Sequence, residues 1–262
     1  MSFKSRKFKV DWEQDLPKYY FDDSPFKTHL FNSFSILFKE GERFFIESVK
    51  IYRNSITDPK QLEDIDSFIK QESWHSYTHN QYNNWLIKNG SPVEYIEENV
   101  VLRGFGKIKK AINERGWLTT TSSFEHITAI AAEYVLLNPE VMEKMHPHFR
   151  ELWRLHSIEE IEHKAVAFDI LTAIGGNPRR RLNCFVMGFV FIFAVLKITA
   201  ILLKADKQLW KWRTFKDAAS LLFNYRNGIV IKLFLPWTKS LRKDFHPNDH
   251  DTTLLLQRFA TA

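Results

Sequence analysis

The sequence predicts an all-α protein, for two reasons. The chain of 262 residues contains only 9 Gly and 9 Pro but 23 Phe and 8 Trp, so turn signals are few and the segments between them are long. Within these segments apolar residues recur at helical spacing, as at Leu62, Ile65, Phe68 and Ile69. A chain of this length can also bury a substantial core.

Prolines, glycines and capping residues divide the chain into its expected helices. The expected helices cover about 25–56, 60–89, 92–115, 119–137 and 142–174, followed by an apolar segment, 184–203, and two amphipathic stretches. We therefore divide the chain into an N-terminal arm (1–26), a helical bundle (27–176) and a C-terminal part (177–262) that packs on or extends the same domain.

Charge and cysteine content exclude several classes of protein. The net charge is +6, but the basic residues form small scattered clusters without a recognisable nucleic-acid module, so we expect no nucleic-acid partner and a mild attraction to anionic lipid. The single cysteine, Cys184, excludes an internal disulfide and a multi-thiolate metal site. Residues 1–15 have no secretory signal, so we expect a cytoplasmic protein, either free or at the inner face of the membrane.

Paired glutamate and histidine residues suggest a metal site. Residues i and i+3 share one face of a helix, so a Glu-x-x-His pair can direct a carboxylate and an imidazole at one ion. Ferritin-like dimetal proteins use two such pairs and add one glutamate from each of two other helices. Three pairs occur in this chain: Glu72/His75, Glu143/His146 and Glu160/His163.

The two single glutamates also stand in the expected order. Glu42 precedes the first pair and Glu125 precedes the last, which gives one set of ligands for each helix of a bundle. This order predicts a ferritin-like four-helix bundle with additional helices, one of them strongly apolar. We exclude Glu143/His146 from the site because Pro147 follows it, where the helix is expected to break.

Further residues can join the site or surround it. His156 lies four residues before Glu160 on the same helical face, so a third imidazole can enter the coordination sphere. His79, one turn after His75, is either an extra ligand or a partner that orients one. Glu47 competes with Glu42 for its role. The residues that we assign to outer positions or to solvent are His126, Glu133, Glu159, Glu162 and Asp169.

The donor set predicts the metals and the chemistry. Carboxylates and imidazoles without thiolates suit two ions of iron, our first choice, or of manganese or zinc. Our leading hypothesis is a non-haem dinuclear iron oxidoreductase, an oxygenase or hydroxylase that oxidises an organic, hydrophobic substrate. It needs an external electron donor, because the chain has no flavin or nicotinamide motif. The alternatives are a metal-dependent hydrolase and a non-catalytic, membrane-associated metal-binding protein.

The motifs resemble those of two families. The strings GERFF, FIKQESWHSYTHNQYN, EHITAIAAE, HSIEEIEHKAVAFDI and DFHPNDHD, between about Phe31 and His250, resemble the bacterial family of predicted metal-dependent hydrolases. The His-x-x-x-Glu-x-x-His motif also resembles that of the dinuclear-iron arylamine N-oxygenases. This second resemblance implies oxygen chemistry and a site with seven ligands: Glu42, Glu72, His75, Glu125, His156, Glu160 and His163.

The apolar segment 184–203 allows more than one placement. Its 20 residues can cross a bilayer as a helix, and Arg179, Arg180 and Arg181 directly precede it. A membrane contact would allow an apolar substrate to arrive from the lipid. The alternatives are a central buried helix and a helix that forms a homodimer.

Overall fold

The structure is a computed structural model that describes Arg6 and residues 10–260. It confirms the all-α, ferritin-like prediction, since the described residues contain helices and a single isolated bridge between Phe21 and Met145. Part of the predicted arm, 1–5 and 7–9, lies outside the described residues. The described part of the arm, 10–24, forms no helix before the first bundle helix begins at Pro25.

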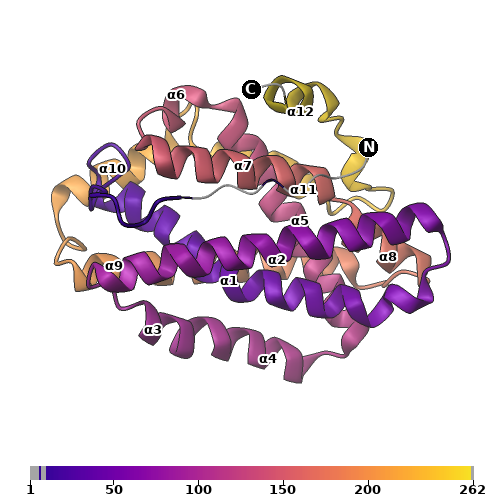
Figure 1. Ribbon diagram of the computed structural model, residues 1–262. Helices are drawn as coiled ribbons and strands as arrows, with labels where there is room; N and C mark the ends of the chain where they lie inside the picture. Colours follow the sequence, from indigo (N-terminus) through magenta and orange to yellow (C-terminus); the bar gives the residue numbers. More distant parts are fainter. Residues whose placement is uncertain (1–5, 7–9, 261–262) are drawn as a thin grey trace.

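Long antiparallel helices form the central bundle (Figure 1). Helix α1 packs along α2, and α5 packs along α7 and its short continuation α8. The bundle helices are α1 (Pro25–Tyr52), α2 (Pro59–Lys88), α5 (Glu114–Leu137), α7 (Pro147–His163) and α8 (Val166–Ala173). The two helix pairs also contact each other, which places one face of each long helix in a common interior.

Side-chain caps set the starts of these helices. Ser24 accepts a hydrogen bond from the backbone N–H of Lys27, and Asp58 caps α2 in the same way, each just before a proline in the first turn. Helix α5 begins at Glu114, five residues earlier than expected, because Asn113 accepts a hydrogen bond from the N–H of Gly116. The run 119–123 that we expected to cap α5 lies inside it and is buried.

The remaining elements cover the bundle. The segment 92–115, which we predict to be one helix, is divided by a π-helical turn. A short helix also precedes α7. These additional elements are η1 (Arg53–Ser55), α3 (Val93–Ile96), η2 (Glu97–Leu102), α4 (Arg103–Ala111), α6 (Pro139–Met142), α9 (Arg180–Ala205), α10 (Trp212–Phe223), α11 (Ile229–Lys239), η3 (Pro247–Asp249) and α12 (Thr253–Ala260). Helix α9 packs against α1 and α5, and α11 packs against α5.

Helix α9 contains the apolar segment. Within the described residues it alone is long and apolar enough to cross a membrane, judged by length and composition. Only 39% of its most apolar window is buried inside the protein. The buried side includes Cys184, Val195, Ile198 and Leu202. The segment is therefore neither a central buried helix nor a helix without protein contacts, since one side packs on the bundle and the other is exposed.

Two apolar clusters lie on either side of a buried polar layer in the bundle. Along α2, Ile65 and Phe68 belong to one cluster, while Tyr82 and Trp85 belong to the other. The residues between them on the buried side of α2 are polar, and Glu72 has no exposed surface. The apolar clusters hold the four helices at fixed distances, so they position the polar layer.

Candidate metal centre

Seven buried side chains from four helices meet in the polar layer. Helix α1 supplies one, α2 two, α5 one and α7 three. They are the residues of the predicted set: Glu42, Glu72, His75, Glu125, His156, Glu160 and His163, none more than 8% exposed. Two groups of four, which share His75 and Glu160, have potential ligand atoms within 4.8 Å of one another: Glu42, His75, His156 and Glu160, and Glu72, His75, Glu160 and His163.

His163 lies between two carboxylates. Its Nε2 atom is 3.0 Å from Oε1 of Glu72, and its Nδ1 atom is 2.9 Å from Oε2 of Glu125. Glu125 belongs to neither of the two groups of four, so it joins the cluster through His163. The ring of His163 also packs edge-on against Phe68 of the apolar cluster, with a centroid distance of 5.0 Å. These contacts fix the orientation of the imidazole.

The other two imidazoles of the predicted set face Glu160. The Nδ1 atom of His75 is 3.6 Å from Oε1 of Glu160 and 3.7 Å from Oε1 of Glu72. The Nε2 atom of His156 is 3.3 Å from the same Glu160 oxygen. Glu160 therefore lies at the centre of the cluster, where a carboxylate can bridge two cations.

Two residues support the cluster from outside. Glu159 accepts a hydrogen bond from Nε2 of His75 at 2.9 Å and is only 2% exposed. His79 is 3.0 Å from Oγ of Ser35 through Nδ1, and its Nε2 atom is 3.6 Å from Oε1 of Glu42. The sequence alone places Glu159 among the outer or solvated charges. Only its position next to Glu160 in the sequence could have indicated that Glu159 is the partner of His75.

Three of the proposed outer residues lie elsewhere. Glu47 is on the surface of α1 beside Lys109, because five residues after Glu42 a helix has turned by about 140°. His126 is buried against Phe245 rather than against the cluster. Asp169 pairs with Nε2 of His246 at 2.8 Å, again outside the cluster. We therefore place none of the three beside the cluster.

The excluded pair also lies outside the cluster. Exposed Glu143 follows the end of α6, and His146 precedes the start of α7 at Pro147. The two residues therefore lie in the connection between α6 and α7 and share no helical face, as expected from the proline. Glu133, another residue that we assigned to outer positions, pairs with His250 at 3.1 Å. Glu162 pairs with Arg6 at 2.7 Å at the edge of the bundle.

The buried atoms of the cluster fit metal ions. Buried polar atoms are normally hydrogen-bonded, and unpaired ones call for an explanation. Each of the seven clustered residues has at least one buried oxygen or nitrogen with no hydrogen-bond partner among the described residues, and nine such atoms come from these seven side chains. Two divalent cations would satisfy these atoms and balance the four buried carboxylates, which otherwise are costly to ionise.

Protons compete with cations for the same atoms. Burial, together with the neighbouring carboxylates, raises the pKa of Glu42 and Glu160, and it raises the pKa of Glu125 to about 8. Burial also acts on Glu72, but the positive charge of the neighbouring His163 outweighs it and lowers the pKa of Glu72 to about 2. The pKa of His163 is raised by Glu125 and Glu72 in spite of burial. A cation that enters the cluster must therefore displace protons.

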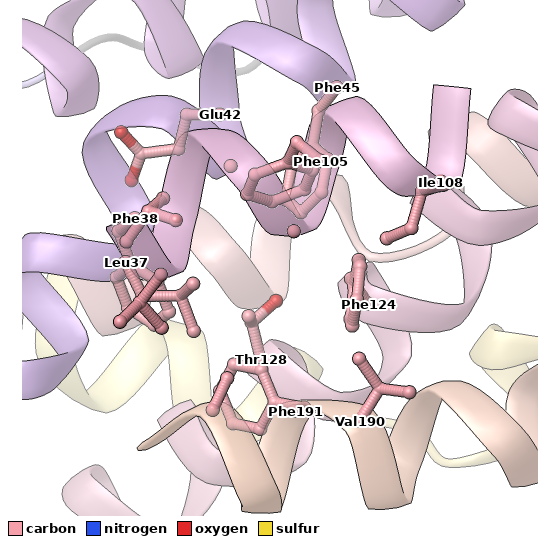
Figure 2. A pocket seen from close by; sticks show the side chains of 15 residues that line it. Leu37, Phe38, Glu42, Phe45, Phe105, Ile108, Phe124, Thr128, Val190 and Phe191 are labelled. Carbon is pink, nitrogen blue, oxygen red and sulfur yellow. The ribbon is translucent and has the colours of Figure 1, made fainter. Parts of the chain in front are cut away.

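An apolar pocket adjoins the cluster at Glu42 (Figure 2). It lies between α1, the η2–α4 segment, α5 and α9, and its walls include Phe45, Phe105 and Phe191. Glu42 and Thr128 are the only polar side chains among its lining residues. Figure 2 shows Glu42 at one end of this pocket and Ile108 at the other. The pocket can hold an apolar group beside a carboxylate of the cluster.

A ferritin-like bundle with buried carboxylates and imidazoles at its centre defines a class of metal-binding helical proteins. The family model described as "predicted metal-dependent hydrolase" matches residues 4–251, and the chain belongs to this family. The match confirms the first of the two resemblances. Neither the search of curated proteins nor the search of solved structures gave a match.

Membership of this family overturns our leading functional hypothesis. The expectation of an oxygen-activating dinuclear iron oxidoreductase is wrong, because the family is described by metal-dependent hydrolysis. The physical reason for the error is that the same carboxylates and imidazoles can hold ions for either chemistry. The motif therefore predicted a metal-binding cluster but not the reaction.

Proposed function

We propose that the protein is a hydrolase that uses two divalent metal ions and acts on a substrate with an apolar portion. The observation that supports this proposal is the position of Glu42, which belongs both to the buried cluster and to the lining of the apolar pocket. A substrate whose apolar group fills the pocket would present its polar end to the cluster. Family membership supports the type of reaction.

The seven clustered residues would hold the metals. When bound, metal ions in such a site polarise a carbonyl or phosphoryl oxygen and supply hydroxide at neutral pH. Hydrolysis then adds the oxygen of water to the substrate, and the leaving group departs with a proton. The carboxylates and imidazoles fit iron, manganese and zinc alike, and hydrolysis requires no change in oxidation state.

Other residues would orient the ligands and exclude water. Glu159 accepts a hydrogen bond from Nε2 of His75. The lone pair of Nδ1 is then directed at the cluster, where it can bind a metal ion. His79 stays neutral, since burial lowers its pKa to about 3, and its Nε2 atom lies 3.4 Å from Nδ1 of His156 and 3.6 Å from Oε1 of Glu42. The phenylalanines of the pocket exclude water from the apolar part of the substrate.

The experiment compares metal-free and metal-loaded protein. The purified chain is stripped with a chelator, reloaded separately with iron, manganese or zinc, and assayed on esters, amides and phosphate esters with short and long apolar groups. We expect hydrolysis only in the loaded protein, with higher kcat/KM for substrates with larger apolar groups. The metal bound on purification, measured by elemental analysis, identifies the ion.

Glu42→Gln and Glu47→Gln form a matched pair of variants on α1. Each removes one carboxylate charge, but only Glu42 belongs to the cluster, and Glu47 pairs with Lys109 on the surface. We expect Glu42→Gln to lower hydrolysis by about 100-fold or more, while Glu47→Gln stays near wild type. Equal losses of hydrolysis in both variants would contradict the proposal, and so would the absence of hydrolysis in every metal-loaded form. Absence of hydrolysis together with tight metal binding would favour a non-catalytic metal-binding protein.

A further inference from the structure

The side of α9 that faces away from the bundle is apolar and exposed. Exposed side chains recur every three or four residues along it, which is the spacing of one helical face. They are Leu182, Phe185, Val186, Phe189, Val190, Ile192, Phe193 and Leu196. Phe193 is 69% exposed. Exposed apolar surface of this extent marks an interaction surface.

Helices α10 and α11 extend this surface. Buried Val195 of α9 shares a small apolar cluster with Leu221 of α10, and Ile229 at the start of α11 packs against the same cluster. Farther along, Trp237 of α11 stacks on Phe185 at 5.6 Å. The three helices therefore lie side by side. On their outer side α10 and α11 expose further large apolar residues: Trp212, Phe215, Phe223, Val230, Ile231, Phe234 and Leu235.

The same part of the chain holds a concentrated positive charge. Residues 177–243 contain 14 of the 37 Lys and Arg residues but only two of the 31 Asp and Glu residues. The formal charge is therefore +12 in this segment and −6 over the rest of the chain. Both acidic residues are engaged within the protein: Asp206 with Lys18, Tyr19 and His29, and Asp217 with Ser24. Arg213 pairs with Asp23 and Asp217, and Arg242 pairs with Asp244. Even with these pairs the segment keeps a large excess of positive charge that can act on a partner.

We infer that the α9–α11 face, the exposed surface defined above, binds the surface of an anionic lipid bilayer. Apolar side chains would enter the boundary between headgroups and acyl chains, and the basic residues around them would contact the anionic headgroups. Trp210 and Trp212, both more than 80% exposed, are suited to this boundary, where an aromatic ring with one polar atom is most stable.

The contacts of α9 favour binding to the membrane surface over a helix that crosses the membrane. Its inner side packs on α1 and α5, and Thr199 donates a hydrogen bond to Oγ of Ser33 at 3.1 Å. To span a bilayer, α9 would have to leave these partners and expose the interior of the bundle. A helix held in this way can lie in the plane of the interface with only its outer side in lipid.

The charge also disfavours a second copy of the chain as the partner. A twofold dimer through this face would place two segments of charge +12 against each other, and like charges across an interface are unfavourable. An anionic bilayer instead has the complementary sign. The inference concerns binding alone and does not depend on the proposed hydrolysis.

Vesicle flotation with the full-length protein tests the inference. The vesicles are phosphatidylcholine alone or phosphatidylcholine mixed with phosphatidylglycerol, and the tryptophan emission is recorded in parallel. We expect binding to the mixed vesicles, weaker binding at high salt, little binding to the neutral ones, and a blue shift of the emission on binding. Failure to bind the mixed vesicles at low salt would overturn the inference.

Two pairs of variants identify the face. Phe193→Ala on α9 should lower the partition coefficient by roughly 10-fold or more, while Tyr77→Ala on α2, where the ring is 53% exposed, should not change it. Lys211→Gln beside α10 should lower it by about 5-fold, and Lys70→Gln on α2 should not. Melting temperatures check that each variant is folded. Equal effects of the two variants within a pair would contradict binding of lipid through the α9–α11 face. A dimer that Phe193→Ala dissociates, with no binding to vesicles, would show that the face binds a second copy of the chain instead.

Discussion

The carboxylate of Glu159 lies 2.9 Å from Nε2 of His75, and both side chains are almost completely buried. This hydrogen bond assigns the proton to Nε2 and turns Nδ1 toward Glu72 and Glu160. Partners of this kind fix the ring of a metal-binding histidine and raise its basicity. Glu159 therefore orients His75 toward the cluster, although we do not count it among the proposed ligands.

Glu159→Gln should weaken metal binding without removing a ligand. An amide oxygen accepts the Nε2 proton less strongly than a carboxylate, so we expect metal affinity to fall by about 10- to 100-fold. Titration of the metal-free protein with zinc, followed by calorimetry, measures the change. Glu151→Gln is the control on the same helix, because Glu151 pairs with Arg154 at the surface. A change of equal size in the control would refute the role of Glu159.

Removal of a single clustered ligand should lower metal content. Glu72→Ala and His163→Ala each delete a buried donor, and each leaves the atoms that faced it without a partner. We expect both variants to retain less than about a tenth of the wild-type metal, because a metal site depends on its full set of ligands. Elemental analysis after purification gives the ratio. Glu143→Ala should stay near wild type, and similar losses in all three variants would show that the ligands are assigned to the wrong pairs.

The stability of the metal-free protein should fall as pH rises from neutral to mildly alkaline values. The pKa of Glu125 is raised from 4.5 to about 8, so between these values the folded chain holds a proton that the unfolded chain has released. Glu125 therefore favours unfolding as pH rises. The raised pKa values of His75 and His163 act in the same direction above pH 6.5. Below pH 6.5 the lowered pKa values of three buried histidines act in the opposite direction: His79, His126 and His156. We therefore expect the net fall in stability above pH 6.5.

Metal ions should reverse this dependence. Because a cation displaces the protons of the cluster, its stabilising effect grows as pH rises. We expect the difference in melting temperature between loaded and metal-free protein to increase by roughly 5 °C or more between mildly acidic and mildly alkaline pH. Glu125→Gln should flatten the curve of the metal-free protein. Parallel curves for loaded and metal-free wild type would argue against a protonated cluster.

The apolar pocket should select substrates by size. Gly104 lines the pocket, and a Cβ atom at this position would meet no atom within 4 Å, so Gly104→Leu can extend into the cavity. We expect a rise in KM of about 10-fold for substrates with large apolar groups, with unchanged metal content. Gly106→Leu is the control, because Gly106 is on the same helix with equal space but does not line the pocket. If both variants bind large substrates like wild type, the pocket is not the binding site.

The starts of the first two bundle helices could be predicted because their signals are local. Ser24-Pro25 and Asp58-Pro59 combine a cap with a proline, and both helices begin there. The π-helical turn 97–102 could not be predicted, since it adds one residue to a turn without a distinctive residue type. Its position beside the pocket depends on packing against α1 and α9.

The cluster illustrates the same limit. The i, i+3 spacing was enough to bring Glu160 and His163 to one face of α7, but the choice between Glu42 and Glu47 required the rotation of α1 about its axis. The role of Glu159 required the distance between α2 and α7. For the segment 184–203, uniform hydropathy gave no information about which side is buried, and the answer came from contacts with α1 and α5.

Helix α9 lies between the pocket and the exposed face, and Val190 belongs to both. Phe191 and Ala194 line the pocket, while Phe189 and Phe193 lie on the outer side. If this outer side rests on a bilayer, a substrate dissolved in the lipid reaches the enzyme by lateral diffusion. The rate would then follow the mole fraction of substrate in the bilayer rather than its bulk concentration, and addition of inert lipid would slow the reaction by surface dilution.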